Sequence, residues 1–368
     1  MHTFAVARAV HGIEPLVATE IRRSRLGVVR GVRHREVWFE AAPGADLTGL
    51  RTADDVLLAA AVVDGIGHGR SALRQLALAA RSVNLAGLTG SGVEVSASFV
   101  GRRNYTRFEI EDAVGAELAR PLRLPYHSRR DGARPPRDAM SWRVTIEGDR
   151  ALIALRLADR PLHRRAYKTD SIRGTLHPPV AAAMAALARL GGAGTVLDPC
   201  CGAGTTLIEA HAVAPGARLL GFDHDPAALR AATANARAGG EGGASADVRA
   251  GVGGRASAEA RAEVGGGAAF GWGVADGGRI PVAGGSVDRV LVNPPWGRQV
   301  PPRGLLARDL GPLWREVRRV LAGDGLAVAL VHDGIPRGFV LEEAVRVSLS
   351  GQHPVIAVLR KEAGRVRR

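Results

Sequence analysis

The spacing of apolar residues over the first 160 positions predicts short strands that alternate with helices. Apolar runs typical of strands lie at 3–10, 36–41 and 93–101. The 3.6-residue spacing typical of helices is found at 13–24, 52–63 and 107–122. A hairpin is expected where the apolar runs 143–147 and 151–157 flank the turn GDR. No fixed repeat is visible, so we predict an α+β region.

The pattern changes at Thr195, where short apolar strands begin to alternate with helices through glycine turns. The runs TVLD (195–198) and RLLGFD (218–223) each precede a helical segment. A further helix is expected near 308–322, with strands at 325–333 and 353–361. Such alternation is typical of a parallel sheet with helices on both faces, so we predict the α/β class with a doubly wound sheet.

The predicted domain organisation has three parts. Residues 1–160 form the N-terminal region, 161–178 a connector and 179–368 the C-terminal domain. Within the last part, residues 239–267 are rich in Gly and Ala and nearly free of large apolar side chains. Because such a segment buries too little apolar surface to offset the entropy of ordering, we interpret it as a flexible insertion.

Charge changes this picture by pointing to a polyanionic partner. The net charge is +14, and the excess is shared, because residues 1–170 carry 27 Lys and Arg against 19 Asp and Glu. A strongly basic chain favours nucleic acid as the partner, although a GC-rich coding background also enriches Arg. The two cysteines, Cys200 and Cys201, are adjacent and build no disulfide framework. With no apolar run of membrane-spanning length and no signal-peptide pattern, we expect a cytoplasmic protein.

The strongest local signal is VLDPCCGAGTT (196–206). An apolar strand ends in Asp198, small residues and glycines follow, and Thr205 opens a helix. Glycines allow close approach of the backbone to a ligand, and the first turn of a helix offers free N–H groups. A plain strand-to-helix turn often uses one glycine but rarely places Asp-Pro before two. The run is neither a phosphate-binding loop, which requires a following Lys, nor a GxGxxG fingerprint.

Two further acidic residues follow the ends of the next strands. Asp223 ends the second strand of the predicted sheet, where a carboxylate reaches a ribose in doubly wound folds. Asp225, followed by Pro226, is interpreted as a helix N-cap. Asp276, after a short third strand, is the candidate for the base of the same ligand, with an uninvolved loop carboxylate as the alternative.

The segment NPPW (293–296) comes directly after the apolar strand 287–292. The prolines fix the backbone, and the side-chain oxygen of Asn293 and the carbonyl of Pro294 form two acceptors for an NH₂ group. Trp296 offers a ring on which the base carrying that amine can stack. A β-turn capped by a buried Trp is the simpler alternative, and the glycine turn and acidic strand ends upstream disfavour it.

In this order, the motifs of residues 172–361 resemble class I S-adenosylmethionine-dependent methyltransferases. DPCCGAGT is similar to the glycine motif of that family, GFDHD to its acidic motif, and NPPW to the motif of enzymes that methylate exocyclic amines. The resemblance implies a Rossmann-like domain with a mostly parallel, seven-stranded sheet. It also implies S-adenosylmethionine as the cofactor, bound by Asp198, Cys200, Gly202, Gly204, Thr205, Asp223, Asp276 and Asn293, with Asn293, Pro294 and Trp296 as catalytic residues.

Upstream segments narrow the resemblance to THUMP-containing RNA methyltransferases. HGIEPLVATEIRRS (11–24), LRTADDVLLAA (50–60), SFVGRRNYTRFEIEDAVGAEL (98–118) and PLHRRAYKT (161–169) are similar to that family. It implies an N-terminal ferredoxin-like and THUMP region that binds RNA, and methylation of guanine N2. The subgroup that the sequence resembles most acts on tRNA at acceptor-stem position 6; relatives act on position 10 or on large-subunit ribosomal RNA. The 239–267 insertion lengthens the spacing ahead of Asn293, which weakens the placement of Asp276.

The RNA contacts are predicted from clustered basic residues, with a solvated surface as the alternative for each. The candidates are Arg102, Arg103, Arg107, Arg164, Arg165 and Lys168. We expect a monomer that binds tRNA or rRNA, no metal and no membrane. The alternatives are a DNA-adenine or protein-glutamine methyltransferase and an inactive RNA-binding module. A THUMP-linked thiouridine synthase is excluded, because its pyrophosphatase loop and separated cysteines are absent.

Overall fold

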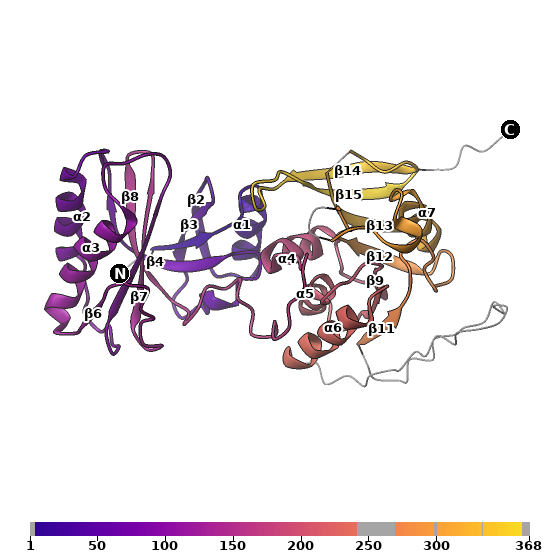
Figure 1. Ribbon diagram of the computed structural model, residues 1–368, viewed down its shortest axis with the longest axis horizontal. Helices are drawn as coiled ribbons and strands as arrows, with labels where there is room; N and C mark the ends of the chain where they lie inside the picture. Colours follow the sequence, from indigo (N-terminus) through magenta and orange to yellow (C-terminus); the bar gives the residue numbers. More distant parts are fainter. Residues whose placement is uncertain (1–3, 241–268, 298–299, 333, 363–368) are drawn as a thin grey trace. The chain divides into compact units, whose positions relative to one another are not determined.

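The computed structural model describes residues 4–240, 269–297, 300–332 and 334–362, so most of the predicted 239–267 insertion lies outside the described residues. Contacts along the chain divide it into two compact units (Figure 1). The N-terminal unit comprises Met1–Ala9 and Val17–Leu162, and the C-terminal unit comprises Val10–Leu16 and His163–Arg368. Among the described residues, no helix combines the length and the apolar content needed to cross a bilayer.

The N-terminal unit is built on an eight-stranded sheet in the order β2-β3-β1-β4-β8-β7-β5-β6. Most neighbours are antiparallel, whereas β5 runs parallel to both β6 and β7. Its elements are β1 (Phe4–Arg8), α1 (Glu14–Arg23), β2 (Gly27–Arg33), β3 (Glu36–Ala41), η1 (Leu47–Gly49), β4 (Asp55–Val63), α2 (Ser71–Arg81), β5 (Val93–Phe99), α3 (Arg107–Leu122), β6 (Tyr126–His127), β7 (Met140–Glu147) and β8 (Arg150–Arg156).

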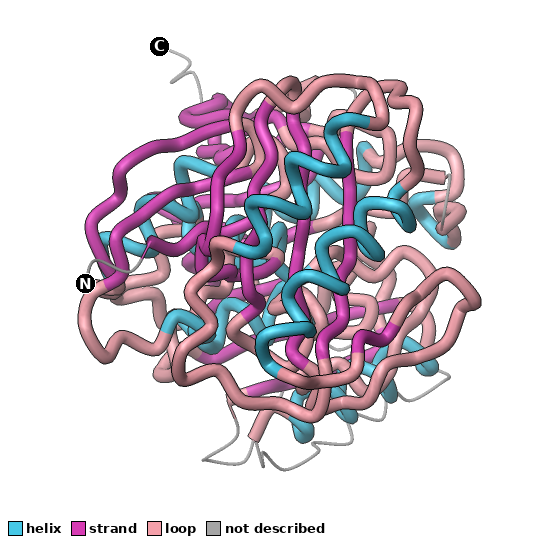
Figure 2. The backbone as a smooth tube through the Cα atoms, turned by 90° about the vertical axis from the view of Figure 1, so that its left-hand side faces the viewer, coloured by secondary structure: helices cyan, strands magenta, loops and turns pink. Residues whose placement is uncertain are grey.

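Helices α2 and α3 lie side by side across one face of this sheet (Figure 2). Their apolar sides bury Leu76, Ile110 and Leu118 against Val95 and Trp142 of the sheet. Because an amphipathic helix is stabilised mainly by burying its apolar face, these contacts hold the α-helical layer in place.

The sequence-based prediction of a helix at 52–63 is wrong. This segment forms β4, which pairs antiparallel with β1 on one side and β8 on the other. The run DVLLAAAVV is apolar at nearly every position, so its periodicity does not distinguish a buried strand from a helix. Pairing on both edges decides the outcome, and the valines fit a pleated surface well.

The C-terminal unit has a seven-stranded sheet in the order β11-β10-β9-β12-β13-β15-β14. The first five strands are parallel, and β15 and β14 are antiparallel to their neighbours. The elements are α4 (Pro178–Leu187), β9 (Thr195–Asp198), α5 (Thr205–Val213), β10 (Arg218–Asp223), α6 (Pro226–Ala238), β11 (Phe270–Val274), β12 (Val287–Val292), η2 (Gly304–Leu306), α7 (Gly311–Val320), β13 (Leu321–Val331), β14 (Phe339–Arg346) and β15 (Val355–Lys361). The predicted α/β class and its seven-stranded sheet are confirmed.

The direction of winding reverses between β9 and β12. From β9 the chain proceeds through α5, β10 and α6 to β11, and from β12 it proceeds through α7 to β13 on the other side. Because parallel crossovers are right-handed, α5 and α6 lie on one face of the sheet and α7 on the other (Figure 1). The carboxyl ends of β9 and β12 therefore diverge, and this is where doubly wound folds bind ligands.

Close packing of the first three strands depends on Gly221 in β10. A Cβ at this position would lie 2.3 Å from the ring of Trp272 in β11 and 3.0 Å from Leu207 of α5. Trp272 also lies over Gly204, at the start of α5, where a Cβ would meet its ring at 2.9 Å. One tryptophan thus fills the space that two glycines leave open.

We predict that Gly221→Ala destabilises the C-terminal unit by about 1–3 kcal/mol, because the added methyl overpacks the Trp272 ring. Gly216→Ala is the matched control, because a Cβ at Gly216 meets nothing within 4 Å. Thermal unfolding measures both variants. Equal melting temperatures for the two would contradict the packing role of Trp272.

Candidate active site

A cavity of about 710 Å³ opens where the strands β9, β10, β12 and β13 end, at the reversal of winding. This volume lies within the range of small-ligand sites. The structure brings nearly all predicted site residues of this unit to its wall, namely Lys168, Asp198, Cys200, Gly202, Thr205, Asp223, Asp276, Asn293, Pro294 and Trp296. The predicted residues of this unit that do not line the cavity are Arg164, Arg165 and Gly204, and Gly204 instead begins α5 against Trp272.

The buried carboxyl of Asp198 shapes the glycine turn. Its Oδ1 accepts a hydrogen bond from the backbone N–H of Cys200 at 3.0 Å, and its Oδ2 accepts one from the hydroxyl of Thr206. Asp198 is only 1% exposed. Burial raises the pKa of the Asp198 carboxyl to about 7, and the nearby Asp223 adds to this effect, while the two donors oppose it.

The turn is connected to the next strand through Gly202. Its backbone N–H donates to Asp223 Oδ2 at 3.0 Å, which joins the end of β9 to the end of β10. Gly202 has a φ of +53°, a left-handed conformation in which glycine is favoured. A Cβ at Gly202 would meet only the end of the Ile172 side chain, at 3.6 Å, so the cavity side of this residue is open.

Cys200 and Cys201 are not reactive thiols in this setting. Burial raises the pKa of both thiols, and the carboxylates of Asp198 and Asp223 add to the rise. Because the thiolate is the nucleophilic form, both side chains behave as small apolar groups. Cys200 thus contributes shape to the cavity.

Thr205 supplies a direct test of whether the turn suits a polar ligand. Thr205 is 3% exposed and lines the cavity, and its Oγ1 has no hydrogen-bond partner among the described residues. A buried hydroxyl without a partner is unfavourable unless a ligand or water satisfies it. Together with the open side of Gly202 and the N-terminus of α5, this hydroxyl fits a ligand with polar groups over the turn.

The structure confirms the capping role predicted for Asp225, whereas the ribose role of Asp223 stays a prediction. Asp225 Oδ1 accepts from the N–H of Ala227 at 2.8 Å and caps α6, with Pro226 in the first turn, so the predicted N-cap is confirmed. Asp223 Oδ1 accepts from the N–H of Asp225 at 3.0 Å, and its Oδ2 holds Gly202. His224 Nδ1 also lies 3.3 Å from Oδ1, so the acceptor capacity that Asp223 keeps is the second lone pair of Oδ2.

Asp276 holds two loops together. Its Oδ1 accepts from Gly278 N–H at 2.8 Å and its Oδ2 from Leu305 N–H at 2.8 Å. Gly304 has a φ of +57°, and a Cβ there would lie 2.0 Å from Asp276 Oδ2, so only glycine allows this approach. The observed contacts give Asp276 a structural role that sequence reasoning did not foresee, and its role toward a bound base stays a prediction.

Asn293 and Trp296 contact each other at the end of β12. The indole Nε1–H of Trp296 donates to Asn293 Oδ1 at 3.0 Å. This hydrogen bond fixes which end of the Asn293 amide faces the indole and leaves one lone pair of Oδ1 for another donor. The ring of Trp296 also meets His332 edge-on, with ring centroids 4.2 Å apart and an interplanar angle of 70°.

His332 is a wall residue that sequence reasoning missed. It follows β13 directly, at the same edge of the sheet as Asn293, and lines the cavity. The signal was available, because a polar residue just after a buried parallel strand lies at the ligand-binding edge of such sheets.

The basic candidates of the N-terminal unit separate into structural and exposed side chains. Arg103 donates to the backbone carbonyls of Gly67, at 3.1 Å, and Gly148, and to the hydroxyl of Tyr105 at 3.2 Å. Arg102 is exposed, and Arg107 lies over the ring of Phe108 at 4.6 Å. Arg103 therefore holds the loop in shape, while the other two remain available to a partner.

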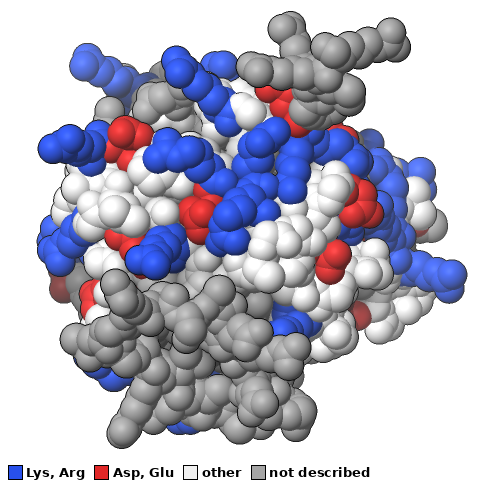
Figure 3. Space-filling view, turned by 90° about the vertical axis from the view of Figure 1, so that its right-hand side faces the viewer, with Lys and Arg blue, Asp and Glu red and all other residues white. Residues whose placement is uncertain are grey.

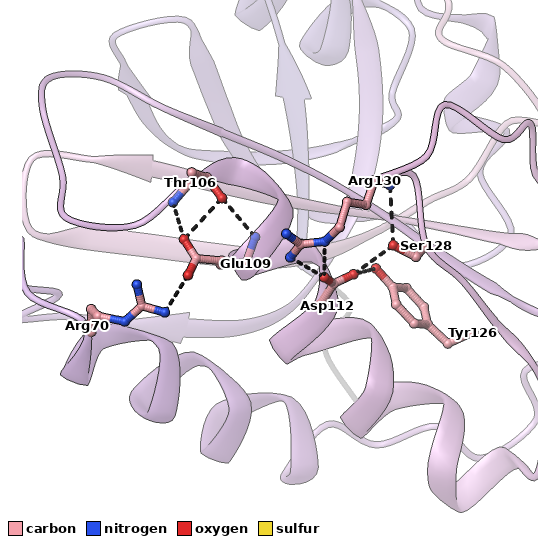
Figure 4. Close-up of polar contacts among 7 residues, drawn as sticks. All are labelled: Arg70, Thr106, Glu109, Asp112, Tyr126, Ser128 and Arg130. Atoms are coloured by element: carbon pink, nitrogen blue, oxygen red, sulfur yellow. Dashed lines mark hydrogen bonds and ion pairs between the residues drawn. The ribbon is translucent and has the colours of Figure 1, made fainter.

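The same loop leads into α3, whose first turns are fixed by polar contacts (Figure 4). Thr106 and Glu109 form a capping box, and Glu109 also pairs with Arg70. One turn further on, Asp112 accepts from Tyr126 at 3.0 Å, from Ser128 at 2.9 Å and from Arg130. These contacts give the basic loop a rigid base.

The candidates of the connector also differ from one another. Arg165 pairs with the fully buried Glu209 at 2.9 Å, and Tyr167 donates to the same carboxylate at 2.8 Å, so Arg165 is structural. Arg164 is exposed. Lys168 is half-buried in the cavity wall, and this burial lowers the pKa of its ammonium group.

Known proteins resemble the chain at several levels. Residues 165–344 match the family model of RMKL-like methyltransferase domains. The tRNA (guanine(6)-N2)-methyltransferase of Thermus thermophilus is 29% identical over 326 residues, which cover 86% of this chain and 87% of that protein. The crystal structure of TrmN from Thermus thermophilus is 27% identical with a TM-score of 0.74, over 98% of this chain and 100% of that chain.

A shorter match is to the ribosomal RNA large subunit methyltransferase K/L of Methylococcus capsulatus. It is 32% identical over 143 residues, which are 34% of this chain and only 18% of that protein.

The raised pKa of Asp198 predicts how stability depends on pH. Between pH 4 and 7 the unfolded chain has released this proton while the folded chain still holds it, so stability falls as pH rises, by up to about 1.4 kcal/mol per pH unit. Asp198→Asn keeps the shape and has no proton to lose. We therefore expect the free energy of unfolding of the variant, relative to that of the wild type, to increase by about 2 kcal/mol from pH 5 to pH 8. Urea denaturation at both pH values measures this difference, and parallel pH dependence of the two proteins would contradict it.

Proposed function

We propose that this chain, whose residues 165–344 belong to the family of RMKL-like methyltransferase domains, methylates the N2 amine of a guanosine in structured RNA. The methyltransferase family predicted from the sequence is confirmed by the family model and by the likeness to TrmN. The THUMP assignment of the upstream region stays a prediction. S-adenosylmethionine is the cofactor, and when bound it supplies an electrophilic methyl group on a sulfonium.

The observation that carries the proposal is the position of Asn293, Pro294 and Trp296. They share one cavity with the glycine turn of Asp198–Thr205, at opposite sides of the reversal between β9 and β12. An amine held by Asn293 therefore faces the ligand that the turn holds. Asp198, Thr205 and Asp223 are the residues that would hold the cofactor. The Thr205 hydroxyl, which has no hydrogen-bond partner within the described parts of the chain, supports a polar ligand there.

The chemistry requires positioning, because the lone pair of guanine N2 is delocalised into the ring. Asn293 Oδ1 and the Pro294 carbonyl accept the two N–H groups and hold the amine with its lone pair directed at the methyl group. The Trp296 N–H fixes the Asn293 amide, so that its oxygen and not its nitrogen faces the amine. Transfer would form the N–CH₃ bond as the bond between the methyl carbon and the sulfonium sulfur breaks, so that the neutral thioether is the leaving group and the surplus amine proton passes to water. A guanosine in a stem has to leave its base pair to enter the cavity.

Structured RNA of the tRNA type is the substrate we favour. The relative that matches 86% of this chain is named for guanine N2 of tRNA position 6, whereas the ribosomal RNA enzyme matches 34%. The net charge of +14 suits a polyanion. Position 10 of tRNA, large-subunit ribosomal RNA and a DNA adenine or protein glutamine are the competing targets.

The decisive experiment is methyl transfer to unmodified tRNA, ribosomal RNA fragments and duplex DNA, followed by mass spectrometry of the nucleosides. We expect N2-methylguanosine in tRNA. Methylated adenosine in DNA, with none in RNA, would overturn the proposal. Asn293→Ala should lower turnover by about 100-fold or more, because one of two acceptors on the amine is removed. Calorimetry should show that this variant retains most of its binding of S-adenosylmethionine, because Asp198, Thr205 and Asp223 remain, and near-normal turnover would refute the clamp.

The N–H group of Trp296 can be tested apart from its ring. Trp296→Phe keeps a ring for stacking but removes the donor to Asn293 Oδ1. Because the Asn293 amide is then free to rotate, we expect turnover to fall by about tenfold or more with little change in the Michaelis constant for RNA. Trp314→Phe, at a tryptophan outside the cavity wall, is the matched control. If Trp296→Phe retained wild-type turnover, the ring alone would account for the role of Trp296.

A further inference from the structure

Four exposed arginines of the C-terminal unit, which we name the rim arginines, stand beside the cavity. They are Arg279, Arg303, Arg308 and Arg315. In the part of the chain that the structure describes, none of them forms an ion pair or a side-chain hydrogen bond. None belongs to the glycine turn or to the Asn293 clamp, so neither the cofactor nor the target amine accounts for them.

The rim arginines come from three segments that meet at Gly278. A Cβ on Gly278 would lie 2.8 Å from Leu305 Cβ and 3.1 Å from Pro312 Cβ. Arg279 follows Gly278 directly, and Arg303 and Arg308 bracket η2, which packs on α7. Arg315 lies three residues after Pro312 and therefore on the same side of α7.

The rim is continuous with the cavity through Arg303. This residue lines the cavity together with Trp296 and with Asp276. A nucleotide whose base lies against Trp296 would therefore have Arg303 at the mouth through which its backbone passes.

The carboxylates near the rim are already engaged. Asp276 holds Gly278 and Leu305, Asp309 Oδ1 accepts from Gly311 N–H at 2.6 Å, and Glu316 binds Arg319 and the N–H of Ile280. The pKa of the Glu316 carboxyl is lowered mainly by its hydrogen bond with Arg319, and the positive charge of Arg279 adds to this effect. Figure 3 shows that Lys and Arg side chains gather on the described surface on this side, to which α7 belongs.

Arginines elsewhere in the described chain are of both kinds: some are paired with acids, and others, such as Arg230 and Arg237 of α6, are exposed. Arg81 binds Glu117, Arg130 binds Asp112, and Arg165 binds Glu209. What distinguishes the rim arginines is that four of them come from adjoining segments beside one cavity, and the mutual repulsion of their positive charges is relieved when an anion binds.

We propose that the rim arginines bind backbone phosphates of the RNA strand that delivers the target guanosine, with Arg303 at the phosphate nearest the cavity. The inference rests on the proposed function. Guanidinium groups form paired, charge-assisted hydrogen bonds with phosphate oxygens, and such contacts set the register of the strand without reading sequence. The bases stay unread at the rim, and the choice of guanine is left to the clamp.

The test is the triple variant Arg303→Ala/Arg308→Ala/Arg315→Ala in the full chain. We expect its affinity for tRNA, measured by filter binding, to fall about tenfold or more at low salt. The slope of log K against log salt should become shallower by about 2 to 3 units, roughly one for each phosphate that an arginine no longer neutralises. Binding of S-adenosylmethionine, measured by calorimetry, should not change. The triple Arg→Lys variant keeps the charges and should retain most of the salt slope.

The matched control is Arg230→Ala/Arg237→Ala. Both arginines are exposed residues of α6, on the face of the sheet opposite α7. The inference would be overturned if the rim variant kept the tRNA affinity and the salt slope of the wild type, or if the α6 variant lost as much of both. In either case, methylation of tRNA by the wild-type chain would leave the proposed function standing. A wild-type chain that methylates DNA and not RNA would instead refute the proposed function, and the rim proposal with it.

Discussion

The geometry of the whole site depends on one buried carboxyl group, that of Asp198. It lies between the backbone of Cys200 and the hydroxyl of Thr206, so it fixes the turn that connects β9 to α5 from both ends. Burying an acid with only two donors raises its pKa to about 7, and the fold tolerates this cost at a position where a ligand is expected. From this turn, Gly202 reaches Asp223 and brings β10 into register with the same edge.

The predicted ligand acceptors already hold donors of the protein itself. Asp223 holds two backbone N–H groups, Asp276 two more, and Asn293 the indole of Trp296. An oxygen with a second lone pair is oriented, and not used up, by such a contact. Internal hydrogen bonding therefore fixes the site before any ligand arrives, which reduces the ordering that a weak nucleophile such as an amine would otherwise require.

Sequence reasoning selected candidates that mostly line one cavity, because these residues follow strand ends and the carboxyl ends of parallel strands meet at one edge by topology. It identified Asp198, Asp223 and Asn293 on this basis, but it did not foresee that Trp296 donates to Asn293 or that Asp276 joins two loops. Those contacts depend on side-chain geometry, which spacing along the chain does not contain. The same limit explains Arg103 and Arg165, which look like free charges in the sequence and turn out to hold backbone carbonyls and a buried glutamate.

The helix predicted at 52–63 failed for a related reason. A run that is apolar at almost every position carries no period, and its partners β1 and β8 lie far away in the sequence. The rim arginines show the opposite case, because only the folded chain reveals which of many arginines lack an acid partner. Asp276 ties the loop of Leu305, next to Arg303, to the end of β11. One carboxylate thus supports both the cavity and the surface beside it, so the proposed RNA contacts at the rim and the proposed clamp at Asn293 would share a common support.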